Sequence, residues 1–360
     1  MVLTAESYCD EAHRSLKKIP GLDALRGVAI IMVMMIHASQ VFSGSDFLKS
    51  LFAVGDKGVQ LFFIVSGFTL WISLITSKFS LMRYVSARFF RIYPLYLIFC
   101  LFYAIYLFGK SWYWCPGGVG YFEIFSNIAL LHGLFPMAAN SLVPGGWSIG
   151  TEVAFYSLLP VALLIKWTRM RFTILFVVSL SIALASILYS QKQYSNGNYI
   201  LGAYFGTFSI LVNLTCFVLG AGLGSMYIRD NNYFPTNLMG YCIALLSTIF
   251  LIVSQLYISS PFLVIFQIGC LGVLTFSLSK NRMSSPFARL IVRLGTVSYS
   301  VYFVHFIVLK ILSKCFIGLD DLLIQLVFCF ALVTFSLGVS IVTHRFIESP
   351  FIRIGKAINL

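Results

Sequence analysis

The sequence predicts an all-α integral membrane protein of about ten transmembrane helices, with both termini in the cytoplasm. Hydrophobic residues make up 59% of its 360 residues and charged residues only 10%, whereas a soluble globular chain carries about 25% charged residues. Long apolar runs recur along the chain and are continuous, which argues against the alternating pattern of a transmembrane barrel. So few charges cannot cover a water-facing surface, and the chain is therefore expected to lie in a bilayer.

Ten segments are apolar and long enough to cross a bilayer, for which about 20 residues are needed. They are Ala24–Ser43, Val59–Ile75, Phe89–Phe108, Ile149–Trp167, Phe172–Tyr189, Tyr204–Ile228, Leu238–Tyr257, Phe262–Leu278, Leu294–Leu312 and Leu322–Val342. The apolar run Phe122–Leu134 is too short to cross and is expected to be re-entrant or interfacial.

The basic residues are distributed unevenly between the two sides that these spans create. With a cytoplasmic N-terminus, 19 Lys and Arg residues fall in inner segments and 6 in outer segments, which accounts for all 25. Cytoplasmic loops carry the excess of basic residues in membrane proteins, so both termini are expected inside. The formal net charge of +13 then follows from topology, and no nucleic-acid partner is expected.

We expect one membrane domain over residues 1–360, with residues 1–20 as a cytoplasmic leader and no extracytoplasmic globular domain. The first apolar run is longer than the roughly 7–15 residues of a signal-peptide core, and the largest outer segment is Gly109–Trp147. The eight cysteines lack metal-ligand spacing, so no metal site is predicted. The string GAGLG at Gly220–Gly224 follows an apolar span, which favours helix packing over a nucleotide-binding loop.

Ionisable groups inside a membrane are costly and are therefore candidates for function. Arg26 and His37 lie in the first span, eleven residues apart. At 1.5 Å per residue this is about 16 Å of helix rise, and it is nearly a whole number of turns, so both side chains share one face. One interpretation is that Arg26 extends to the lipid headgroups and His37 packs in the core. The alternative is a functional site along this face.

The fourth span begins GGWSIGTEVAFYSLLP and places Glu152 about one turn into the membrane from the outer side, near Trp147 and Tyr156. A carboxylate there must be neutral or paired, and His37 is expected at a similar depth. These positions predict a general-base pair in which Glu152 orients the His37 imidazole. Trp147 is also compatible with an interfacial belt of aromatic residues.

Two further groups of polar residues have both a structural and a functional interpretation. In the ninth span, Tyr302 and His305 share a helical face, which predicts either a polar lining that contacts substrate or hydrogen bonds between helices. Arg88 and Arg91 lie one helical turn apart in the most basic inner loop. Topology alone accounts for them, but two guanidinium groups facing the same way are also typical of phosphate binding.

Four strings, taken in order, resemble the acyltransferase family 3 membrane proteins, which are bacterial enzymes that acylate extracytoplasmic glycans. They are LDALRGVAIIMVMMIHA, GVQLFFIVSGFTL, ARFFRIYPLY and GWSIGTEVAFYSLLP, with SYSVYFVH in support. The resemblance implies acetyl-CoA as the acyl donor, reached from the cytoplasm, and a sugar hydroxyl of a glycan or lipid-linked oligosaccharide as the acceptor. His37 and Arg26 match the family's essential histidine and arginine, and Arg88 and Arg91 match its cytoplasmic arginine motif.

The expected catalytic residues are therefore His37, Glu152 and Arg26, and the expected acyl-CoA ligands are Arg88, Arg91 and Arg26. Trp147, Tyr156, Tyr302 and His305 are expected to contact substrate.

One departure from the family pattern concerns Gln60, because many members have Asp there, and so no catalytic charge is expected at this position. The chain resembles the stand-alone type of the bacterial inner membrane, which lacks the SGNH-hydrolase-like domain of some members. That type is associated with lipopolysaccharide O-antigen, capsule or exopolysaccharide. The alternative class is a transporter or flippase of lipid-linked sugars, which also needs many spans and intramembrane polar groups.

Overall fold

The computed structural model describes residues 19–43, 46–76, 79–162, 168–258, 260, 262–316 and 319–358, and within these the chain is all-helical. The α-helices are α2 (Pro20–Ser39), α3 (Asp46–Ala53), α4 (Gly58–Thr76), α5 (Leu81–Leu107), α6 (Tyr121–Ile128), α7 (Trp147–Ala162), α8 (Arg169–Ser195), α9 (Tyr199–Ala203), α10 (Ile210–Arg229), α11 (Asn237–Tyr257), α12 (Leu263–Leu278), α13 (Pro286–Thr296), α14 (Ser298–Cys315), α15 (Leu322–Thr343) and α16 (Ser349–Ala357). The predicted leader, residues 1–20, lies outside the described residues except for Ile19 and Pro20.

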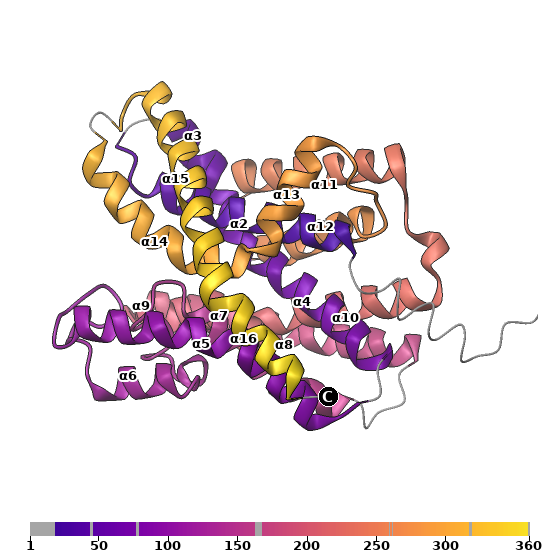
Figure 1. Ribbon diagram of the computed structural model, residues 1–360, viewed down its shortest axis with the longest axis horizontal. Coiled ribbons are helices and arrows are strands. Elements are labelled where there is room, and N and C mark those ends of the chain that lie inside the picture. Colours follow the sequence, from indigo (N-terminus) through magenta and orange to yellow (C-terminus); the bar gives the residue numbers. More distant parts are fainter. Residues whose placement is uncertain are drawn as a thin grey trace, which may run out of the picture.

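Short turns of other helical types connect several of these helices. The 3₁₀ turns are η1 (Val54–Lys57), η2 (His132–Leu134) and η4 (Asn231–Tyr233), and the π-helical turns are η3 (Tyr204–Phe208) and η5 (His344–Glu348). The turn η5 joins α15 to α16 at the end of the last long helix (Figure 1).

Seven helical stretches of the described chain are long and apolar enough to cross a membrane, or eight if α13 and α14, bent by 82° at a short break, are one span. This confirms a multi-pass membrane protein. Two other predicted spans appear as helices of 16 residues, α7 and α12. The apolar run near residue 130 forms α6 and η2, which are both too short to cross. The total of ten spans and the side of the termini stay predictions.

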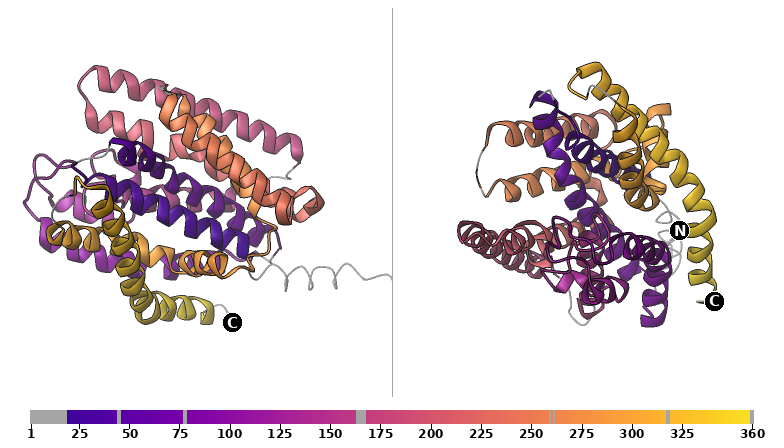
Figure 2. Two further views of the ribbon diagram at one scale, coloured as in Figure 1. Left: turned by 90° about the horizontal axis from the view of Figure 1, so that it is seen from above. Right: turned by 90° about the vertical axis from the view of Figure 1, so that its left-hand side faces the viewer.

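Helix α4 is the central element of the bundle. It packs against α2, α10 and α12. In the stretch Phe47–Thr76, which contains α4, 72% of an apolar segment of 18 residues is buried, compared with 22% of the corresponding segment of α8. In the view from above, α2 and α4 lie between α14–α15 on one side and the helices α8, α10, α11 and α12 on the other (Figure 2). A central helix surrounded by protein can carry polar side chains, because lipid does not reach them.

The crossing of α4 and α10 depends on glycine. A Cβ atom built on Gly220 would collide with the Ile64 carbonyl group, and one built on Gly67 would collide with the Phe217 carbonyl group. Small residues let two transmembrane helices approach until their backbones touch. This confirms that the GAGLG string belongs to a helix-packing surface.

We expect Gly220→Ala to lower the melting temperature of the purified protein in detergent, because the added methyl group cannot be accommodated between two backbones. Overpacking of this kind costs about 1–3 kcal/mol. The matched control is Gly222→Ala on the same helix, where the nearest atom to an added Cβ is Phe172 Cδ1 at 4.0 Å. Equal melting temperatures for the two variants would contradict the assigned packing.

Candidate active site

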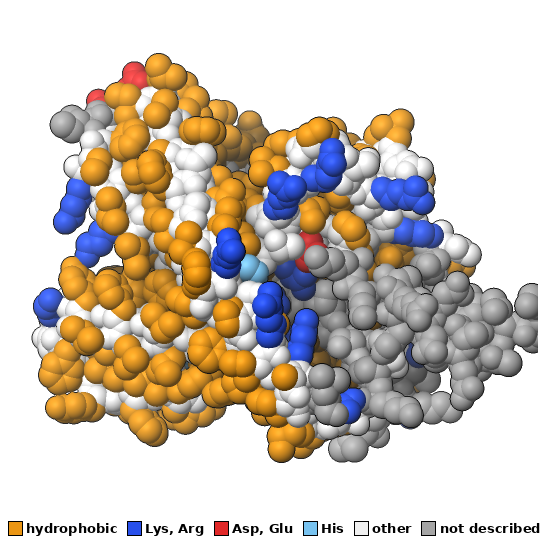
Figure 3. Space-filling view, viewed as in Figure 1, with side chains coloured by type: hydrophobic (Ala, Val, Ile, Leu, Met, Phe, Trp, Pro, Cys, Tyr) orange, Lys and Arg blue, Asp and Glu red, His pale blue; other side chains and the backbone are white. Residues whose placement is uncertain are grey.

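A cavity of about 750 Å³ opens between α2, α4, α5, α7, α14 and α16. Its lining is rich in polar groups, which include Asp23, Arg26, Ser66, Thr69, Arg88, Arg91, Glu152, Tyr156, Thr296, Ser298, Tyr302, His344 and Lys356. Lys and Arg side chains gather around a hollow near the middle of one face of the molecule (Figure 3). Residues far apart in the sequence thus form one hydrophilic chamber within an apolar bundle.

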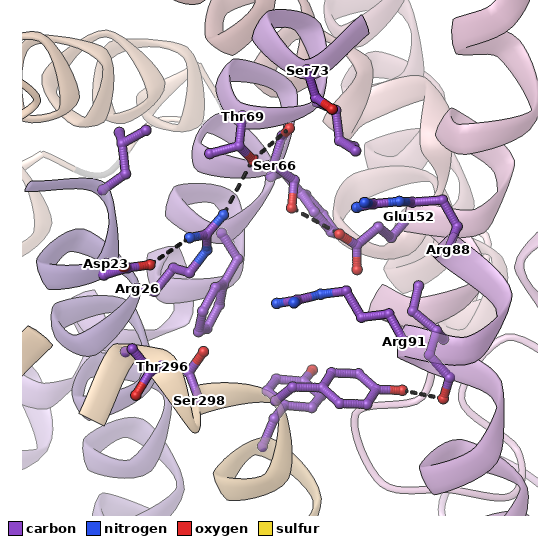
Figure 4. A pocket seen from close by; sticks show the side chains of 18 of the residues that line it. Asp23, Arg26, Ser66, Thr69, Ser73, Arg88, Arg91, Glu152, Thr296 and Ser298 are labelled. Carbon is purple, nitrogen blue, oxygen red and sulfur yellow. Dashed lines mark hydrogen bonds and ion pairs between the residues drawn. The ribbon is translucent and has the colours of Figure 1, made fainter. Parts of the chain in front are cut away.

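Three arginines from two helices converge on this cavity (Figure 4). Arg26 on α2 is held by Asp23, whose Oδ1 lies 2.8 Å from Nη1, and its Nη2 donates to Thr69 Oγ1 at 3.1 Å. Arg88 and Arg91 on α5 form no ion pair with any carboxylate in the described part of the chain. The buried Arg88 Nε also has no hydrogen-bond partner. The two guanidinium groups therefore bring positive charge to the cavity. A bound anion could neutralise that charge.

Glu152 lies in the same cavity, beside the arginines (Figure 4). Its Oε1 accepts hydrogen bonds from Ser66 Oγ at 2.7 Å and from the Tyr156 hydroxyl at 2.5 Å. The Tyr156 ring faces the Arg88 guanidinium, 6.0 Å from its centroid. The expected pairing of Glu152 with His37 is not observed between these two described residues. α7 directs Glu152 toward α4 and α5 instead.

His37 lies near the other end of α2 from Arg26 and is not among the residues that line the cavity. Its Nδ1 lies 3.1 Å from Gln40 Oε1. The ring contacts Phe306, at 4.6 Å between centroids, and His305, at 5.5 Å. Phe306 and His305 both belong to α14, so this helix places His305 beside His37.

Of the other two residues that were predicted to contact substrate, Tyr302 lies at the cavity and Trp147 lies in the core. Tyr302 lines the cavity, donates to the Gly145 carbonyl oxygen at 3.0 Å and accepts from Ser148 Oγ at 2.9 Å. Trp147 is 8% exposed and packs in the core against Phe63 and Phe208. Its surroundings are those of a packing residue in this structure.

Two features in or beside the cavity were missed in the sequence. Asp23 pairs with Arg26 three residues later, and this helical spacing was a usable signal. The buried Glu348, 3% exposed, accepts from Ser300 Oγ at 2.7 Å and lies 3.0 Å from His344 Nδ1. The spacing of His344 and Glu348 would suggest an ion pair on a helix, but only the fold shows that Ser300 completes the cluster.

A second buried polar network holds the segment that leads into α7. His132 is fully buried, and its Nε2 lies 2.9 Å from the Gly146 carbonyl oxygen. Because a carbonyl oxygen only accepts, the ring proton is on Nε2. Tyr96 packs its ring against His132 and donates to Asn127 Oδ1 at 2.8 Å. The network ties α5 and α6 to the turn from which Glu152 and Tyr156 follow.

Burial lowers the pKa of His132 from 6.5 to about 4. Between these two values the unfolded chain binds a proton at this site and the folded protein does not, so stability falls as the pH drops from about 6.5 to about 4. The linkage amounts to about 3 kcal/mol. We expect the melting temperature to fall over this range, and to fall less in His132→Gln, whose amide can still donate to Gly146. An identical pH dependence in both proteins would contradict the assignment.

Comparison with known proteins agrees with this architecture. The family model described as an acyltransferase domain, that of acyltransferase family 3, matches residues 19–345. A Staphylococcus aureus (strain COL) protein with a provisional O-acetyltransferase name is 26% identical over 391 residues, covering 96% of this chain and 59% of its own length. O-acetyltransferase OatA of S. aureus (strain NCTC 8325) is 24% identical over the same shares of the two chains.

A third relative, acyltransferase MdmB of Streptomyces mycarofaciens, is 29% identical over 151 residues, or 40% of this chain and 38% of its own length. The chain thus spans only 59% of the length of the S. aureus relatives that it matches. No solved structure matches. Because the family model covers most of the sequence, the chain belongs to acyltransferase family 3.

Proposed function

We propose that this protein is an O-acetyltransferase of the bacterial inner membrane. It moves an acetyl group from cytoplasmic acetyl-CoA to a sugar hydroxyl of an extracytoplasmic glycan, such as lipopolysaccharide O-antigen or exopolysaccharide. The observation that carries the proposal is the convergence of Arg26, Arg88 and Arg91 on one cavity, with His37 eleven residues from Arg26 on the same helix. Relatives whose names say O-acetyltransferase support the choice of an acetyl group.

The cavity is suited to the phosphates of an acyl-CoA. Arg88 and Arg91 face it without a carboxylate partner among the described residues, and Arg88 Nε is a buried donor that lacks an acceptor. Phosphate oxygens would supply that acceptor, since guanidinium groups bind them in a bidentate manner. Glu152 is then a member of this anion site, where it fixes Tyr156 beside Arg88. Tyr302, on α14, lines another wall of the cavity.

The chemistry would occur at the other end of α2. Arg26 and His37 are separated by about 16 Å of helix rise, so a donor anchored by its phosphates must extend its pantetheine arm along the helix. His37 takes the proton of the sugar hydroxyl while that oxygen attacks the thioester carbonyl carbon. The new C–O bond forms, the C–S bond breaks, and the proton passes from His37 to the departing CoA sulfur.

A transporter of lipid-linked sugars is the second candidate from the sequence. It would also need polar groups within the bundle, but it has no use for three arginines that face one cavity together with a histidine at the far end of the same helix. Membranes that contain the protein, incubated with acetyl-CoA labelled in the acetyl group, separate the two functions. Stable label on surface polysaccharide supports the enzyme. Translocation of an unlabelled lipid-linked sugar would contradict it.

We expect His37→Ala to reduce transfer of the labelled acetyl group about 10²–10⁴-fold, the usual contribution of a general base. The variant should insert and melt like the wild-type protein, because this side chain is only partly buried. The readout is the acetyl content of the surface glycan, measured by mass and proton NMR. A wild-type acetyl content in the variant would eliminate His37 as the base.

We expect Arg88→Gln to raise the KM for acetyl-CoA at least tenfold while leaving the KM for acetyl-N-acetylcysteamine thioester unchanged. The second donor carries the same reactive thioester without phosphates, so only acetyl-CoA should lose a charge-assisted hydrogen bond, worth about 1.5–3 kcal/mol. Arg169→Gln is the matched control, because Arg169 is exposed and pairs with Asp230, and neither residue lines the cavity. An equal increase in KM for both donors would show that the substitution disturbs the fold and would contradict phosphate binding by Arg88.

A further inference from the structure

The last helix, α16, forms one wall of the cavity. Ser349, Ile352 and Lys356 all line the cavity, and their helical spacing places them on one face of α16. Exposure to solvent increases along this face, from the half-buried Ser349 and Ile352 to the exposed Lys356. Lys356 therefore lies where the cavity opens to solvent. The whole of α16 follows residues 19–345, the part of the chain that the family model matches.

Close packing between α16 and α5 brings Lys356 near the arginines of the cavity. The two helices lie against each other (Figure 1), and a Cβ atom built on Gly355 would lie 2.8 Å from Phe90 Cβ. Phe90 lies between Arg88 and Arg91 on α5. Lys356 directly follows Gly355 on α16. The helices thus approach most closely where both of them carry cations that line the cavity.

Like Arg88 and Arg91, Lys356 lines the cavity without an ion pair to any carboxylate of the described residues. The two guanidinium groups belong to one turn of one helix and are suited to adjacent phosphates. The ammonium group comes from a second helix, on a flexible stem, and is suited to a separate phosphate. Coenzyme A distributes its charge in this way. It has a diphosphate and, on the ribose of its adenosine, a 3′-phosphomonoester with a charge of about −1.5 to −2 at pH 7.

Helices α5 and α14 run side by side in the same direction. The Tyr299 hydroxyl donates to the Ile92 carbonyl oxygen at 2.7 Å. Further along both helices, the ring centroids of Phe99 and Phe303 are 5.0 Å apart. The part of α14 that contacts His37 comes later still. Positions that precede Ile92 on α5 therefore lie on the side away from His37.

Lys356 belongs to the end of the cavity that is farther from His37, because α16 meets α5 at Phe90, before Ile92. In the proposed function, the acetyl thioester extends along α2 toward His37. The adenosine end of the donor then stays at the opposite end of the cavity, beside Lys356. In the covalent structure of CoA the 3′-phosphate is farther from the thioester than the diphosphate is, so it is the phosphate that reaches this end.

We propose that Lys356 binds the 3′-phosphate of the acyl-CoA donor. This inference rests on the proposed function. It adds a ligand on α16 to Arg88 and Arg91, which then bind the diphosphate. It also makes Lys356 a specificity residue, because a thioester of 3′-dephospho-CoA offers the ammonium group no partner.

The test measures the Kd of CoA and of 3′-dephospho-CoA by isothermal titration of the purified full-length protein in detergent. The ionic strength is kept low, because salt screens exposed charges. We expect Lys356→Gln to raise the Kd of CoA about five- to tenfold, between the value of an exposed ion pair and that of a hydrogen bond to a charged group. Its Kd for 3′-dephospho-CoA should equal that of the wild-type protein. Lys356→Arg keeps the charge and should bind CoA within about twofold of wild type.

Arg353→Gln is the matched control, because it removes one positive charge from the same helix at an exposed residue that does not line the cavity. It should bind both ligands like the wild-type protein. An unchanged Kd of CoA in Lys356→Gln, an equal increase for both ligands, or an equal effect of Arg353→Gln would overturn the inference. Failure of the wild-type protein to bind CoA would overturn the inference and the proposed donor together. The expected binding pattern without transfer of labelled acetyl groups to glycan would overturn the proposed function alone.

Discussion

The need to partner charge inside an apolar bundle organises this protein. A buried ion without a partner costs several kcal/mol, and only about one residue in ten of this chain is charged. Several of these charges lie around one cavity, where Asp23 holds Arg26 and two hydroxyl groups hold Glu152. The close crossing of α4 and α10 at glycine makes this possible, because it keeps α4 in the centre with its polar side chains away from lipid.

In the proposed function, the cavity and the His37 imidazole perform different tasks of acyl transfer at the two ends of α2. Arginines at one end suit a polyanionic donor, and imidazoles near the other end suit proton transfer from an acceptor. Because α2 is one continuous helix from Pro20 to Ser39, the distance between the two tasks is fixed by backbone hydrogen bonds. In the proposed function, this rigid spacer would let one bundle handle a donor and an acceptor that approach from opposite faces of the membrane.

Much of the local structure could be predicted from the sequence. The apolar runs near residues 30, 65, 95, 180, 218, 248 and 332 each form a long helix. The reason is that the backbone N–H and C=O groups of a segment in lipid must hydrogen-bond to one another. The ends of the helices, and which helices are long enough to cross the bilayer, were harder to predict. α12 is only 16 residues long, and the bend between α13 and α14 separates an amphipathic segment from a buried one.

For the candidate site, the sequence could predict which residues share a helix and a face: Arg26 with His37, and Arg88 with Arg91. Helical periodicity fixes those relations within one element. Which helices face one another could be learned only from the three-dimensional packing. It directed Glu152 to Ser66 and Tyr156, set His305 beside His37, and closed a cluster of Ser300, His344 and Glu348. Partners on different helices depend on crossing angles and depths, which arise from packing between side chains far apart in the sequence.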